Sequence, residues 1–116
     1  MKKYLCVDVG GTSIKMAVLD EDGPIYEAKK VKVPPTIEDM YQVVVDEFSS
    51  HQSLKGVALS MPGAVDSEKG VIGGSSAIDY IHGPHIKEDL ENRLNVPVEM
   101  ENDANCAALA EVWKGA

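Results

Sequence analysis

Residues 3–19 read KYLCVDVGGTSIKMAVL, two apolar segments separated by the pair Gly10-Gly11. The first segment, 3–9, has the β-branched and aromatic content of a buried strand, and 14–19 reads as a second strand. Two glycines allow the chain to reverse tightly between the segments. The stretch therefore predicts a hairpin at the start of an α/β fold.

The chain beyond this hairpin extends the same sheet and then changes character. A turn at 20–24 precedes a third strand at 25–33, which completes an antiparallel meander before Pro34-Pro35 breaks it. Thr36, with Asp39 three residues later, predicts the N-cap of a helix over 37–50.

The second half of the chain alternates strands and helices around one long loop. The expected elements are a strand at 54–60, an irregular segment at 61–85 with two short strands, a helix at 86–94, a strand at 96–100 and a final helix from near Asp103. The order βββαβ(loop)αβα predicts a mixed sheet with helices packed on its faces. Long loops such as 61–85 are often functional.

Composition excludes several classes of protein. The 116 residues fit one domain, and the net charge of −8 disfavours nucleic acid and anionic membranes as partners. No apolar run approaches the roughly 18–20 residues of a membrane span, and Asp8 interrupts the N-terminal one, so we expect a cytoplasmic protein. His51, His82 and His85 lack metal-ligand spacing, so no zinc site is expected in this chain.

The glycine turn is a candidate phosphate-binding loop. Because Gly10-Gly11 has no side chain to block an anion, its amides can approach phosphates, and Thr12-Ser13 adds hydroxyl donors. Lys15 supplies positive charge, and Asp8 at the strand end can hold Mg²⁺ through water. The segment matches neither GxxxxGKS/T nor GxGxxG, so a plain β-hairpin is an equal alternative.

A second polar cluster, Glu101-Asn102-Asp103-Ala104-Asn105, follows the strand expected at 96–100. One alternative is simple helix capping, which favours Asn and Asp. Active sites of open α/β sheets lie at the carboxyl ends of strands, where Asp8 is also expected, so both clusters can face one cleft. Asp103 is then a candidate general base for a hydroxyl that attacks a γ-phosphoryl group, and Asn102 can orient that substrate.

Together these segments resemble the ROK family (repressors, open reading frames and sugar kinases) of the actin/hexokinase/sugar-kinase superfamily. The matching motifs are DVGGTSIK at 8–15, SMPGAVD at 60–66 and ENDANCAALAE at 101–111. The family has two ribonuclease-H-like lobes with the active site between them. The resemblance makes 1–116 a single N-terminal lobe. The second lobe, with its adenosine-binding glycine loop and zinc site, is then absent from this chain.

The resemblance also implies a role for each motif. It places the phosphates of ATP against Gly10-Gly11-Thr12, and it gives Asp8 a role in holding Mg²⁺ through water. It makes Asp103 the base that activates the hydroxymethyl group of the sugar. Asn102 and Gly63 are expected to contact that sugar.

The loop suggests which sugar is bound. Ala77-Ile78 stands where glucokinases of the family carry an Asn-Leu pair that touches the sugar. Ala-Ile and the Tyr-Ile-His-Gly run at 80–83 are more similar to β-glucoside kinases, although Asp79 departs from that pattern. The resemblance implies ATP-dependent phosphorylation of the 6-hydroxyl of a hexose or β-glucoside.

Other interpretations follow from the expected missing lobe. Stabilising the transferring phosphoryl group needs donors on both sides of a closed cleft, so we expect the isolated chain to be inactive. The alternative is a non-catalytic module that binds sugar or pairs with a second chain, since an exposed half-cleft favours a homodimer. Another actin-like ATPase would lack the ENDAN base, and a ROK transcriptional regulator is disfavoured because no helix-turn-helix precedes Met1.

Overall fold

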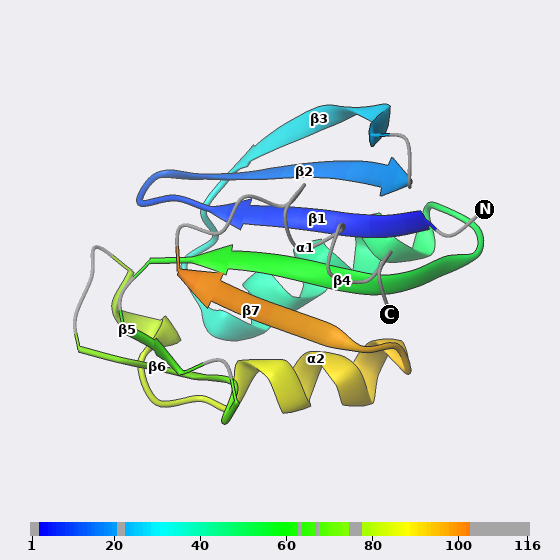
Figure 1. Ribbon diagram of the computed structural model, residues 1–116. Coiled ribbons are helices and arrows are strands. Elements are labelled where there is room, and N and C mark those ends of the chain that lie inside the picture. The colour runs from blue at the N-terminus through cyan, green and yellow to red at the C-terminus, as the bar shows by residue number, and fades with distance from the viewer. Residues whose placement is uncertain (1–2, 21–22, 63, 67, 75–77, 103–116) are drawn as a thin grey trace.

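The computed structural model describes residues 3–20, 23–62, 64–66, 68–74 and 78–102. In this part of the chain, two helices cover one five-stranded sheet, and a short hairpin lies beyond one of its ends (Figure 1). The elements are β1 (Lys3–Val9), β2 (Ser13–Asp20), β3 (Gly23–Lys32), α1 (Ile37–Ser49), β4 (Leu54–Met61), β5 (Ala64–Asp66), β6 (Val71–Gly73), the 3₁₀ turn η1 (Asp79–Ile81), α2 (Ile86–Leu94) and β7 (Val98–Asn102).

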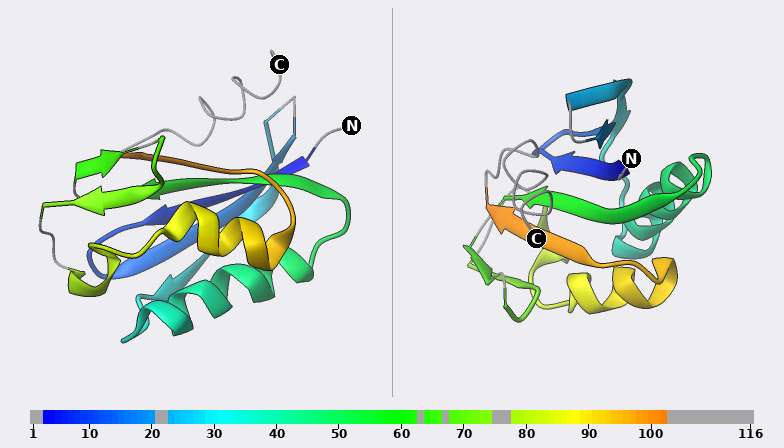
Figure 2. Two further views of the ribbon diagram at one scale, coloured as in Figure 1. Left: turned by 90° about the horizontal axis from the view of Figure 1, so that it is seen from below. Right: turned by 45° about the vertical axis from the view of Figure 1, so that its right-hand side comes forward.

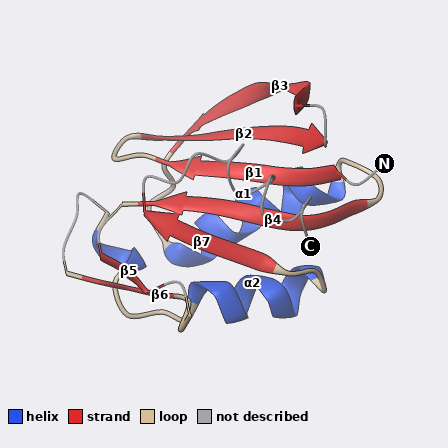
Figure 3. Cartoon of the chain, in the orientation of Figure 1, coloured by secondary structure: helices blue, strands red, loops and turns tan. Residues whose placement is uncertain are grey.

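The large sheet is mixed, as the sequence predicts. Its strand order is β3-β2-β1-β4-β7, with β1, β2 and β3 antiparallel and with β4 and β7 parallel to β1 (Figure 3). The predicted antiparallel meander is therefore confirmed. The parallel strands follow from the helical crossovers, because a strand can return in the same direction only after a long connection.

The described helices share one face of the sheet. Figure 2 shows α1 and α2 side by side on the same side of the sheet. Alternate residues of the strands, Val7 and Leu59 among them, are buried in this core with Val44 of α1 and Leu90 of α2. Neither helix has the length and hydropathy needed to cross a bilayer, in so far as the described residues show. The predicted final helix from Asp103 lies outside those residues.

Thr36 caps α1 as predicted. Its hydroxyl oxygen accepts a hydrogen bond from the amide of Asp39 at 3.1 Å, which satisfies one of the free donors at the helix start. The chain therefore leaves the sheet at Pro34-Pro35 and enters α1 at a defined residue. Because the end of β3 and the start of α1 are both defined, the two prolines between them have a fixed position beside the sheet.

The last strand lies two residues later than expected, at Val98–Asn102 instead of 96–100. Proline has no amide hydrogen for the ladder, and Pro97 contributes its carbonyl oxygen to the amide of Val57 at 3.0 Å. Residues 98 to 102 then pair with Val57 to Met61 of β4. As a result, Asn102 belongs to the strand and marks its carboxyl end.

The segment predicted as irregular, 61–85, contains the two short strands that were expected, β5 and β6. Gly70 closes their turn with φ of +70°, and its amide donates to the carbonyl of Asp66 at 2.8 Å. Its own carbonyl accepts from the amide of Lys87 in α2 at 3.3 Å. An isolated bridge between Ile72 and His82 ties the hairpin to the end of η1.

Candidate functional site

The carboxyl ends of β1, β4 and β7 meet at one edge of the sheet. The register places Asp8 opposite Ser60, and Met61 of the next row opposite Asn102. Asp8 and the end of β7 are therefore two strand spacings apart, roughly 10 Å. Each of the three predicted motifs thus has a residue at this edge, namely Asp8, Ser60 and Asn102, as expected for the active site of an open α/β sheet.

Asp8 lies on the face of the sheet away from the described helices. Its neighbours Val7 and Val9 are buried in the helix-covered core, whereas Asp8 itself is exposed. Lys15 of β2, also exposed, is its register partner on that face. The pair places an oxygen ligand and a positive charge beside the glycine turn.

The glycine turn is a tight connection with its own internal hydrogen bond. The amide of Gly10 donates to the carbonyl of Ser13 at 2.8 Å, and a Cβ on Gly10 would lie 3.3 Å from that same oxygen. The carbonyl of Thr12 accepts from the amide of Val33 at 3.2 Å, which fastens the turn to the end of β3. Gly11 and Thr12 are exposed at its tip. The amide of Gly10 is therefore already engaged within the turn in this conformation.

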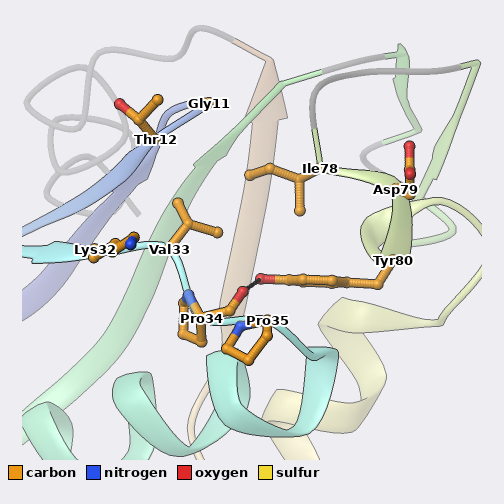
Figure 4. Close-up of a pocket in the computed structure, with 9 residues that line it drawn as sticks. All are labelled: Gly11, Thr12, Lys32, Val33, Pro34, Pro35, Ile78, Asp79 and Tyr80. Atoms are coloured by element: carbon orange, nitrogen blue, oxygen red, sulfur yellow. Dashed lines mark hydrogen bonds between the residues drawn. The ribbon is translucent and has the colours of Figure 1, made fainter.

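A cavity of about 640 Å³ opens beside the tip of the turn (Figure 4). It joins four segments that are distant in the sequence: the glycine turn, the end of β3, the two prolines and the start of η1. Its lining residues in the described part of the chain are Gly11, Thr12, Lys32, Val33, Pro34, Pro35, Ile78, Asp79 and Tyr80. The volume is typical of cavities that bind small molecules.

Tyr80 closes the end of the cavity opposite the glycine turn. Its hydroxyl donates to the carbonyl of Pro34 at 2.7 Å, which joins η1 to the connection between β3 and α1 (Figure 4). Burial raises the pKa of Tyr80, and the nearby carboxylate of Asp39 raises it further. The hydroxyl therefore stays protonated and keeps its role as a donor.

The structure brings together several of the predicted site residues. Gly11, Thr12 and the buried Ile78 line one cavity, although Ile78 was assigned to the sugar and the other two to phosphate. Three further predicted residues, Gly63, Ala77 and Asp103, lie outside the described residues.

Sequence reasoning did not identify Lys32, Pro34 or Tyr80 as cavity residues. In the sequence, Pro34-Pro35 indicates only the end of the meander, and Tyr80 belongs to a run that resembles β-glucoside kinases. The signal that could have revealed them is an aromatic residue after a long glycine-rich loop. That signal does not say which segment the ring will meet.

Residues 4–116 match the ROK family. The β-glucoside kinase of Klebsiella pneumoniae is 37% identical over 114 residues, which cover 97% of this chain and 38% of that protein. The glucokinase of Halalkalibacterium halodurans is 35% identical over 125 residues, which cover 97% of this chain and 37% of that protein. The chain thus spans less than two fifths of the length of these relatives, and it matches their N-terminal part.

Solved structures of ROK family proteins are also similar to this chain. A ROK family protein from Streptococcus pneumoniae in complex with sucrose has a TM-score of 0.79 at 41% identity, covering 97% of this chain and 38% of that one. A ROK family glucokinase from Streptomyces griseus in complex with glucose and AMPPNP has a TM-score of 0.77 at 35% identity, covering 98% and 37%. These neighbours have the actin-like, hexokinase-type fold of ROK sugar kinases. The chain belongs to the ROK family.

Proposed function

We propose that this chain is the N-terminal lobe of an ATP-dependent sugar kinase that phosphorylates the 6-hydroxyl of a hexose or β-glucoside. One observation carries the proposal: Asp8, the glycine turn and the end of β7 share one edge of the sheet. The named activities of the relatives, β-glucoside kinase and glucokinase, support the same reaction class. Phosphoryl transfer to an alcohol needs this combination of a phosphate loop and an acceptor site.

On the donor side, the exposed tip of the glycine turn receives the phosphates of ATP. The amides of Gly11 and Thr12 are the proposed donors, with Lys15 adding charge. Gly10 keeps the turn closed through its bond to Ser13. The exposed carboxylate of Asp8 fits a hard cation, which prefers oxygen ligands. Mg²⁺ held there through water would neutralise charge on the phosphates.

On the acceptor side, Asp103 is the proposed general base at the end of β7. Its carboxylate takes the proton of the 6-hydroxyl as that oxygen attacks the γ-phosphorus, and ADP leaves with the electrons of the broken P–O bond. Asn102 orients the sugar. Gly63 and the pair Ala77-Ile78 are proposed to contact the sugar ring, and the burial of Ile78 at the cavity supports this for one of them.

The proposed lobe supplies only one side of the catalytic cleft. Residues 1–116 form a single N-terminal lobe, and the family's second lobe completes the cleft around ATP and sugar. A dry, closed cleft strengthens the charge stabilisation on which the transfer depends. We therefore expect the chain alone to show no turnover, and we expect its exposed half-cleft to favour a homodimer of this chain.

A coupled assay of ADP formation tests the proposal. The complete kinase, with both lobes, is expected to release ADP with glucose or cellobiose, and Asp103→Asn is expected to abolish turnover while equilibrium binding of the sugar persists. Full activity of Asp103→Asn would refute the assigned base. Robust turnover by residues 1–116 alone would refute the two-lobe requirement, and sugar binding without any turnover by the complete protein would favour a non-catalytic module. Sedimentation of residues 1–116 at micromolar concentration tests the dimer, which a species of 12.5 kDa alone would rule out.

A further inference from the structure

The end of the cavity beyond the glycine turn presents a fixed aromatic ring. The hydrogen bond from Tyr80 to the carbonyl of Pro34 anchors the outer edge of the ring. Figure 4 shows the ring edge-on, so that one face looks across the cavity toward Ile78. A ring held in this way loses little conformational entropy when a flat ligand packs on it. The geometry suits a planar apolar contact.

Two charged residues also line the cavity. Asp79 and Lys32 are both exposed and both line the cavity, with the carboxylate on η1 and the ammonium on the end of β3. A pyranose ring has an apolar face of C–H groups and a perimeter of hydroxyls. The aromatic ring matches the first feature, and an acceptor and a donor at the rim match the second. The chemistry of this end of the cavity therefore fits a sugar ring.

The position of this end decides which sugar ring it can hold. The phosphorylated ring must place its 6-hydroxyl at the strand edge, between the proposed base after Asn102 and the phosphates at Gly11. Tyr80 and Pro34 lie at the opposite end of the cavity from the glycine turn (Figure 4). We infer that the part of the substrate that faces Tyr80 and Pro34 is a substituent on the phosphorylated ring.

We propose that Tyr80 is a specificity-determining residue whose ring supports the second sugar of a β-linked disaccharide, with Asp79 accepting one of its hydroxyl hydrogen bonds. This inference rests on the proposed sugar kinase function. It makes a disaccharide such as cellobiose a better substrate than glucose. Because the second ring does not react, its contacts act on binding of the whole disaccharide.

The test compares cellobiose with glucose in the complete kinase. In Tyr80→Leu, which keeps apolar volume but removes the aromatic face, kcat/KM for cellobiose is expected to fall about tenfold, mainly through KM, while the value for glucose stays within about threefold. Tyr80→Phe keeps the ring and is expected to retain most of the preference. Asp79→Ala, at an exposed position that tolerates substitution, is expected to lower kcat/KM for cellobiose selectively.

Tyr41→Phe is the matched control. The hydroxyl of Tyr41 also donates at 2.7 Å, to the carboxylate of Asp89, but Tyr41 does not line the cavity. Its substitution is expected to leave the ratio of the two kcat/KM values unchanged. Equal losses for both sugars in Tyr80→Leu and in Asp79→Ala would overturn the inference, and so would a kinase that accepts glucose but not cellobiose. If Tyr80→Leu does not fold, the ratio of the two kcat/KM values in Asp79→Ala tests the inference by itself. A complete protein that phosphorylates neither sugar would overturn the proposed function itself.

Discussion

Replacing Gly70 by alanine tests how the hairpin of β5 and β6 is held against α2. Gly70 has φ of +70°, and an added Cβ would overlap the Cβ of Lys87 in the first turn of α2. Atoms so close to a helix backbone cannot move aside without moving the helix. The same glycine also joins the hairpin to α2 through the hydrogen bond from the amide of Lys87. The substitution therefore combines backbone strain with overpacking.

The free-energy cost of each effect has a typical magnitude. A non-glycine residue in the left-handed region costs about 1–2 kcal/mol, and the reduced entropy of the unfolded chain returns about 0.4–1 kcal/mol. Overpacking adds about 1–3 kcal/mol. We expect Gly70→Ala to lower the free energy of unfolding by about 2–4 kcal/mol.

Gly83 provides a matched control for this substitution. Its φ is also positive, at +110°, but an added Cβ there would meet no atom within 4 Å. Gly83→Ala should show the conformational cost alone, a net of about 0–1.6 kcal/mol after the same return of unfolded-chain entropy. Urea unfolding followed by circular dichroism measures both, provided that the m-value is unchanged. If Gly70→Ala destabilises the protein no more than Gly83→Ala does, the overlap with α2 is not present in solution and the reasoning fails.

Three further predictions concern the helix and the site. Burial alone would raise the pKa of Glu47, but hydrogen bonds from His51 and Lys29 hold this pKa below its ordinary value of 4.5. The ionised Glu47 therefore stabilises the fold fully above pH 4.5, and this stabilisation is lost as the pH falls through the lower pKa of the folded state. Glu47→Gln should cost about 1–3 kcal/mol at pH 7 and flatten the acid limb of a pH–stability curve, whereas an unchanged acid limb would contradict the assignment. Thr36→Ala should cost about 1 kcal/mol in urea unfolding through loss of the cap of α1, and Thr36→Ser should restore most of it. Asp8→Asn should raise the Mg²⁺ concentration for half-maximal kinase activity about tenfold, and an unaltered Mg²⁺ titration would remove Asp8 from the proposed metal site.

Much of the fold was predictable because its signals are local. The hairpin around Gly10-Gly11 depends on residues within one turn of each other, and so does the cap between Thr36 and Asp39. The common edge for Asp8 and Asn102 was also predictable, because parallel strands end at the same edge of a sheet. Both the elements and the edge therefore follow from pattern and topology without knowledge of side-chain contacts.

The cavity was not predictable in the same way. Its closure depends on a hydrogen bond between Tyr80 and Pro34, which are 46 residues apart. Nothing in the sequence around either residue predicts their contact. A proline after a strand indicates only that the strand ends, and a tyrosine in a loop has many possible partners. The predicted bounds of β7, 96–100, were wrong for a related reason, because Pro97 pairs through its carbonyl and has no amide hydrogen to donate. Contacts of this kind are decided by tertiary packing.

The two glycines of the turn look equivalent in the sequence but have different roles in the structure. Sequence reasoning treats Gly10 and Gly11 alike, as positions without a side chain where an anion can approach. In the structure, the amide of Gly10 is already bonded to the carbonyl of Ser13, and the space at its Cβ is limited by that same oxygen. Gly11 instead stands exposed at the mouth of the cavity. The first glycine therefore serves the turn itself, and only the second is exposed where the proposed phosphate contact needs it.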